Sequence, residues 1–250
     1  QSDTIVNNDD SELSFNIALL TFDNFRMNFS NNQNLLAANL KIEHLNLSGD
    51  FKADTYQLKG ETEFLIQDII KERKKWLSNK NCSISVDLQV SHNKYNITKA
   101  NIALNKIGLE LGGQFNYGDS LTDLEISFDA PELDIGSLLS LLPTNYGEKI
   151  NDYKSTGNFY AKGKLAYQSN NDYLLESRFG IKKGTITYKV QGTSISEVDV
   201  EGALEYGSKR TSLTLKNIYL KLNNDELKGS GYIKNFSDPY LRFSGAADLN

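Results

Sequence analysis

The sequence has few of the residues from which most catalytic and metal centres are built. Its 250 residues include one cysteine, Cys82, and two histidines, His44 and His92. A lone cysteine excludes a disulfide within the chain, and two distant histidines leave little material for a histidine-based triad or a zinc site. His44 and His92 are better explained as a strand irregularity and a turn. We therefore expect no enzymatic activity, no metal and no cofactor.

A long apolar run and an excess of positive charge are also missing. No window approaches the roughly 20 apolar residues that a membrane-spanning helix needs, so we expect no membrane anchor in this chain. The net charge of −5 and the pI near 5.2 give no broad attraction to phosphate backbones or to anionic lipid surfaces. Nucleic acid is therefore an unexpected partner, and a membrane is expected to be contacted only through an anchor that this chain does not contain. Residues 1–12 are polar and are interpreted as a flexible lead-in, left after a targeting or anchor segment was removed.

What the chain does contain is recurrent alternation of apolar and polar residues. Hydrophobic residues make up 39%, with 12 Phe and 13 Tyr, enough to fold. Period-two alternation predicts strands with one buried face, for example at 13–19, 84–90, 124–130, 159–167, 198–206 and 241–249. The fold class predicted is mostly β: a curved, largely antiparallel sheet forming a groove or an open sandwich.

An internal repeat is visible in three places, where the alternation slips by one residue and then resumes. The slips lie between Ile42 and Leu45, between Ile97 and Ala100, and between Leu215 and Ile218. A strand that keeps its apolar face through such a slip needs a bulge or a bend. Two explanations stay open: ordinary β-meander chemistry, or a repeated unit that builds one continuous curved face.

One short helix is predicted at 134–142, with Asp134 as its cap and Pro143 as its end, and a further turn at 145–153. Residues 64–77 are predicted to be a strand leading into a solvated basic loop before Trp76, with a helix as the alternative. We expect a single β-rich domain over 13–250, with approximate repeat units 13–80, 81–133 and 157–250. The helical insertion covers 134–153.

Motifs for other chemistry are weak. Glu197, Asp199 and Glu201 could pair as catalytic carboxylates, but period-two spacing predicts a wet strand face. Gly157 to Lys164 is a near miss for a phosphate loop, and the acidic turn at 223–226 lacks the spacing of a calcium loop.

Several phrases resemble the AsmA-like proteins of double-membraned bacteria, particularly those of Bacteroidetes. They are SFDAPELDIGSLLSLLP at 127–143, GNFYAKGKL at 157–165, KKGTITY at 182–188 and ELKGSGYIKNFSDPYLRFSGAADLN at 226–250. The resemblance covers somewhat more than half of the chain. It implies a segment of a repeating β-groove protein that is periplasmic and, at full length, anchored in the inner membrane.

The same resemblance implies a non-enzymatic role in outer-membrane biogenesis or phospholipid transport, in which an apolar groove contacts phospholipid or other acyl chains. The candidates for the groove wall are Phe159, Leu165, Val200, Leu204, Phe243 and Leu249. Plain core packing is the competing explanation for each. The alternative function is a periplasmic or surface scaffold that binds protein or glycan partners.

Overall fold

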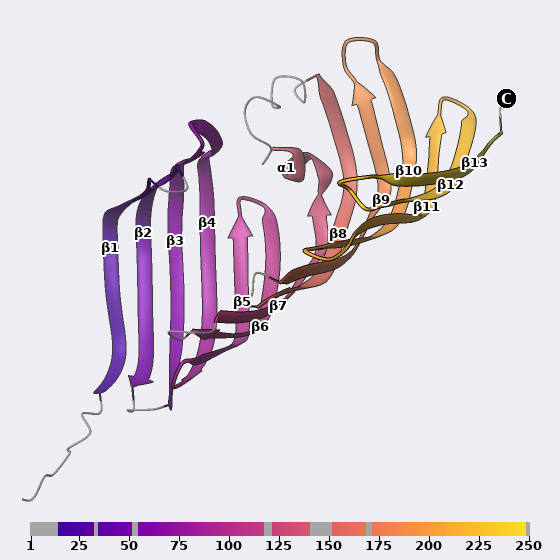
Figure 1. The fold of residues 1–250 in the computed structure, drawn as a ribbon. Coiled ribbons are helices and arrows are strands. Elements are labelled where there is room, and N and C mark those ends of the chain that lie inside the picture. The colour runs from indigo at the N-terminus through magenta and orange to yellow at the C-terminus, as the bar shows by residue number, and fades with distance from the viewer. Residues whose placement is uncertain are drawn as a thin grey trace, which may run out of the picture.

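One antiparallel β-sheet forms almost the whole structure. The computed structural model describes residues 15–32, 35–51, 55–117, 122–140, 152–168 and 172–248. Thirteen strands follow one another in sequence order, each paired with its neighbour in the chain (Figure 1). They are β1 (Phe15–Asn31), β2 (Leu36–Phe51), β3 (Thr55–Lys71), β4 (Lys74–Ser91), β5 (Lys94–Leu104), β6 (Ile107–Tyr117), β7 (Thr122–Asp134), β8 (Tyr153–Tyr167), β9 (Tyr173–Tyr188), β10 (Thr193–Gly207), β11 (Thr211–Leu222), β12 (Asp225–Lys234) and β13 (Tyr240–Asp248).

The sheet is open and has one layer. Extensive contacts among the described elements run only between neighbouring strands, and from the short helix α1 (Ile135–Leu139) to β7 and β8. The prediction of a curved, largely antiparallel sheet is confirmed, and it takes the open form. No helix in the described part of the chain has the length and apolarity of a membrane span.

The two faces of the sheet differ in polarity. Along each strand, apolar and polar side chains point alternately to opposite faces, and the strands pair so that apolar residues lie beside apolar residues. Residues paired across neighbouring strands lie on the same face. Leu88 pairs with Leu58 and Ile97, whereas Lys162 pairs with Asp129 and Arg178. One face is therefore apolar across the sheet, and it is called the apolar face below; the other is the polar face.

The three predicted slips are confirmed as bulges. The pairing register shifts after Ile42, between Ile97 and Ala100, and between Leu215 and Ile218. Further shifts occur between Ala130 and Leu133 and beside Val198. A bulge bends the strand that carries it, so bulges in successive strands bend the whole sheet.

We infer from burial that the apolar face lies on the inside of this bend. Most of the buried apolar residues flank bulges, namely Ile42, Ala100, Ala130, Leu133 and Val198. The bulge residues themselves are exposed: Glu43, His44, Thr98, Lys99, Pro131, Glu132, Glu197, Lys216 and Asn217. Apart from α1, which packs on β7 and β8, no second layer of described structure covers the sheet. Bending of the strands toward the apolar face explains this burial best.

The helix is shorter than predicted within the described residues. It covers Ile135–Leu139, while Leu142, Pro143 and the turn predicted at 145–151 lie outside the described residues. Tyr153, the last residue of the predicted insertion, begins β8 instead. Asp134 is the N-cap as predicted, because its Oδ1 accepts hydrogen bonds from the N–H and the hydroxyl of Ser137, at 2.7 and 2.9 Å. These bonds hold the pKa of Asp134 below its usual value.

Replacing Asp134 by alanine should weaken α1 by about 1 kcal/mol, because the cap acceptor is lost. Hydrogen exchange of the α1 amides measures this, and Asp134→Asn, which keeps an acceptor, is the matched control. The folded-state pKa is lowered, so the carboxylate stabilises the cap above the unfolded value of about 3.9 and loses this effect as pH falls through the folded value. Equal α1 protection in wild type and Asp134→Ala would contradict the prediction.

The predicted basic loop before Trp76 is a tight hairpin turn instead. β3 continues to Lys71 and β4 begins at Lys74, so only Glu72 and Arg73 form the connection. Both have positive φ, +52° and +64°, as two-residue turns with the twist of a hairpin require. The sequence concealed this turn because neither residue is the glycine or asparagine that usually adopts the conformation. The turn predicted at His92 is confirmed between β4 and β5.

Candidate functional site

The apolar face is the most extensive feature that could bind a ligand. At about 4.8 Å per strand, thirteen strands extend it over roughly 55–60 Å, longer than the hydrocarbon core of a bilayer is thick. Cross-strand rows show its continuity. One row joins Phe159, Ile181, Val200 and Ile218, and another joins Leu204, Leu213, Ile233 and Leu241.

The structure places the described groove-wall candidates on this one face. Phe159 and Leu165 lie on β8, and Val200 and Leu204 on β10; all four are half-buried. Phe243 lies on the edge strand β13, where 64% of it is exposed. Leu249 lies outside the described residues.

Exposure of the apolar face rises toward both ends of the sheet. On the edge strand β13, Leu241 and Phe243 are about two-thirds exposed, whereas Ile66 on β3 and Val90 on β4 are almost fully buried. Four apolar residues of β1 form a second exposed group that sequence reasoning missed. They are Leu20, Phe22, Met27 and Phe29. The sequence does contain a pattern that could have revealed them. Leu20 and Phe22 are followed by Phe25 and Met27 after the same slip in alternation as in the three recognised repeats.

Aromatic side chains follow one long rim of the apolar face. A cross-strand row there runs through Tyr56, Val90, Tyr95, Phe115, Leu124, Tyr167 and Tyr173. The rings of Tyr95 and Phe115 stack at 4.5 Å. Tyr206 continues the rim, with its ring 6.0 Å from that of Tyr173. Coulombic repulsion from this neighbour raises the pKa of Tyr173. Tyrosine has an apolar ring and a hydrated hydroxyl, which suits a boundary between apolar surface and water.

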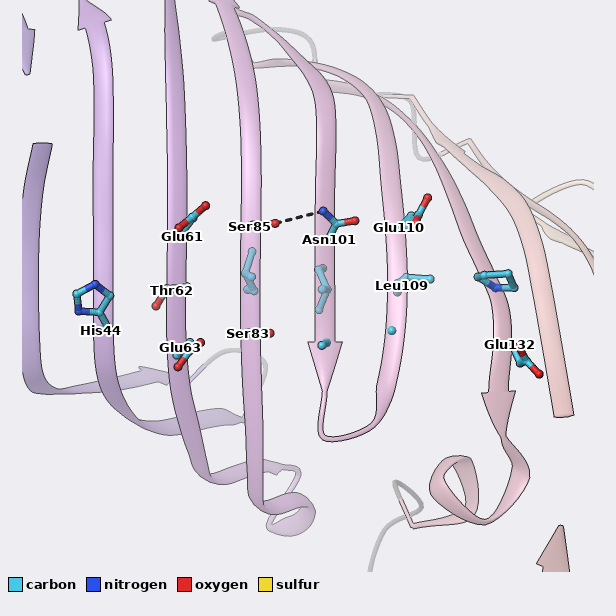
Figure 2. Close-up of a pocket in the computed structure, with 15 residues that line it drawn as sticks. His44, Glu61, Thr62, Glu63, Ser83, Ser85, Asn101, Leu109, Glu110 and Glu132 are labelled. Atoms are coloured by element: carbon cyan, nitrogen blue, oxygen red, sulfur yellow. Dashed lines mark hydrogen bonds between the residues drawn. The ribbon is translucent and has the colours of Figure 1, made fainter. Parts of the chain in front are cut away.

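The polar face carries a hollow of about 430 Å³ across β2 to β7 (Figure 2). Glu61, Glu63, Glu110 and Glu132 are among the residues that line it. At its edge, His44 Nδ1 lies 2.5 Å from Asp23 Oδ1, and its Nε2 lies 2.7 Å from Asn46 Nδ2. Both ring nitrogens of His44 are therefore in contact with neighbouring side chains.

The carboxylate series of β10, predicted to be a wet strand face, is interrupted by a bulge. Glu197 has φ +49° and the register shifts on both sides of it, so it does not continue the alternation of Asp199 and Glu201. Glu197 accepts a hydrogen bond from Lys221 at 3.1 Å, and Asp199 accepts one from the Lys183 N–H at 3.0 Å. Both carboxylates therefore have structural partners.

The remaining weak motifs fall on ordinary structure. The near-miss phosphate loop is part of strand β8, and residues 223 and 224 form the β11–β12 turn. No group of three or more potential metal ligands occurs in the part of the chain that the structure describes. Cys82 is a buried residue of the apolar face, between Phe64 and Leu104, and burial raises the pKa of its thiol.

Comparison with known proteins gives no match for this chain among family models, curated proteins or solved structures.

Proposed function

We propose that the apolar face binds the acyl chains of lipids and that the protein acts without catalysis. The observation that supports this most directly is an apolar face that crosses all thirteen strands and has no second layer of described structure over it. Soluble monomers rarely leave large contiguous apolar patches in water, and those that do use them for binding.

Acyl chains suit this face better than a compact ligand does. The face is long and bent inward, and half-buried side chains such as Leu204 and Phe159 line it. Each methylene group moved from water to such a surface contributes about 0.8 kcal/mol, so affinity would accumulate along a chain without specific polar contacts. The aromatic rim would then lie near the polar end of the lipid.

The AsmA-like resemblance supports a location for this activity. An open curved sheet is the architecture that the resemblance implied. The four phrases that carry the resemblance lie mainly on β7 with α1, on β8, on β9, and on β12 with β13. We propose that the chain is an AsmA-like module of the periplasm, contributing to phospholipid transport or outer-membrane biogenesis as part of a protein anchored in the inner membrane.

Native mass spectrometry after gentle extraction from a bacterial envelope tests the lipid proposal. Wild-type protein should retain phospholipid. Leu204→Asp and Phe243→Asp should lose most of it, because each introduces a charge on the apolar face. The matched controls are Ala203→Asp and Ser244→Asp, which change the adjacent residues on the polar face.

Circular dichroism establishes that each variant is folded. Phe243 is on an edge strand and largely exposed, so Phe243→Asp should remain folded even if Leu204→Asp does not. Lipid-free wild type, or equal lipid retention in the variants and their controls, would contradict the proposal.

A scaffold for protein or glycan partners is the second candidate, favoured by the edges of the sheet. β1 and β13 pair on one side only, and every residue of β13 is exposed. An unpaired edge can accept an extended segment of a partner as an additional strand. Lipid-free wild-type protein would favour this function.

A further inference from the structure

The tip of the β3–β4 hairpin concentrates positive charge in an acidic protein. Residues 71–76, called the basic tip below, contain Lys71, Arg73, Lys74 and Lys75 against one acidic residue, Glu72. They end in Trp76, the only tryptophan of the chain. Charges more than about 10 Å apart are largely screened at 0.1 M salt, so an outlying tip experiences its own charges more than the net −5 of the chain.

The basic tip stands clear of the neighbouring hairpin. The β4–β5 pairing ends at Cys82 and Leu104, and residues 74–80 continue without a β5 partner. Figure 1 shows the β3–β4 hairpin extending beyond the β5–β6 hairpin on this side of the sheet. A flat surface approaching the sheet from this side, which is opposite the aromatic rim, would therefore meet the basic tip before it met β5 and β6.

The basic tip is held in a defined conformation. Its two-residue turn is closed by the Lys71–Lys74 pair, and the Glu72 N–H donates to the carbonyl oxygen of Leu35 at 2.9 Å. Trp76 is the extra residue of the bulge where Ile69 pairs with Leu77 and Ile70 with Lys75. Trp76 is 48% exposed and Leu35 is 56% exposed, so two apolar side chains accompany the cations.

Most of the positive charge at the basic tip is uncompensated. Lys75 pairs with Asp68 at 2.6 Å, but Lys71, Arg73 and Lys74 make no ion pair among the described residues. Lys71 and Lys74 lie directly opposite each other, an arrangement that repels and destabilises the hairpin. An external anionic surface would relieve this repulsion.

We propose that the basic tip docks the protein on an anionic phospholipid surface. Lys71, Arg73 and Lys74 would contact lipid phosphates, while Trp76 enters the interface between headgroups and acyl chains. Tryptophan is enriched at that interface, and basic residues beside it are attracted to anionic lipids. The exposed Leu35 and Trp76 favour a lipid surface over a nucleic acid backbone. This docking does not depend on whether the apolar face holds lipid.

Trp76 fluorescence tests the proposal directly, because no other tryptophan contributes. Vesicles of phosphatidylglycerol and phosphatidylcholine should shift the emission of wild-type protein to shorter wavelength and carry the protein into the pellet on centrifugation. Pure phosphatidylcholine vesicles should do neither. Binding should also fall steeply as salt is raised.

The decisive variant is Lys71→Ala, Arg73→Ala and Lys74→Ala together. A basic residue near an anionic membrane contributes about fivefold to the partition constant, so the triple change should lower it about 100-fold. The control removes the same charge elsewhere, at the exposed Lys99, Lys164 and Lys216, and should bind as wild type does. Urea unfolding confirms that both triple variants are folded.

An unshifted Trp76 spectrum with anionic vesicles, or equal binding by the two triple variants, would overturn the proposal. Binding of single-stranded RNA that is lost in the Lys71, Arg73 and Lys74 variant, without vesicle binding, would overturn the proposal in favour of a nucleic acid partner. Failure here would leave lipid retention by the apolar face unaffected, since native mass spectrometry measures that separately.

Discussion

Gly113→Ala should destabilise the protein by about 3 kcal/mol or more, measured as a shift in the urea midpoint. Gly113 lies on β6 beside the bulge after Ile97, with φ +140°, where an L side chain is strained. A Cβ there would lie 2.1 Å from the carbonyl oxygen of Glu125 and 2.9 Å from the Cα of Ile126. Both are backbone atoms of β7, so the strands themselves would have to separate.

Gly108→Ala is the control on the same strand. A Cβ at Gly108 meets nothing within 4 Å, and the backbone there is not left-handed. Its unfolding free energy should change by less than about 1 kcal/mol. Similar midpoints for the two variants would show that β6 does not pass this close to β7.

The bends of the sheet were predictable because a bulge leaves a local trace. Thr98 and Lys99 interrupt an apolar alternation that resumes at Ala100, and a strand can keep one apolar face across such an interruption only by bulging. The same reasoning located the bulge after Ile42 and the bulge after Leu215. It failed at Glu197, where clean alternation of Val198 with charged residues masked a bulge.

The open state of the sheet could not be predicted, because alternation describes one strand at a time. Leu204 and Phe243 have the same sequence pattern, yet one is half-buried and the other is 64% exposed. This difference in exposure depends on how many strands flank the strand that carries the residue, which is a property of the whole sheet. For the same reason, the sequence did not reveal that the apolar residues of β1 are exposed, although their spacing matches that of the three slips.

The apolar face therefore has two parts with different roles in stability. Residues at the inner corner of the bend and beneath the aromatic rim are buried, so changing them tests folding. Residues near the ends are exposed, so they should be changeable with the sheet intact, and half-buried residues such as Leu204 can be used once circular dichroism shows that the variant is folded. Lipid retention is informative only for the second group, which is why Leu204 and Phe243 are the positions chosen for it.

Val90→Asp tests the first group and should destabilise the protein by about 3–5 kcal/mol. Val90 is 1% exposed and is the only large side chain among the described residues that is almost completely shielded. It pairs with Tyr56 on one side and Tyr95 on the other, where the Tyr95–Phe115 stack continues the rim. An ionised carboxylate there would lose its hydration without gaining a partner.

Gln89→Asp is the matched control, because Gln89 is the preceding residue on β4 and is exposed on the polar face. Its urea midpoint should stay within about 0.5 kcal/mol of wild type. Equal urea midpoints for Val90→Asp and Gln89→Asp would mean that the neighbouring aromatic side chains do not shield Val90 from water in solution. A large difference between the two midpoints would show that the shielded residues of the apolar face stabilise this one-layer sheet. The exposed residues at its two ends would then contribute little to stability and could bind a ligand.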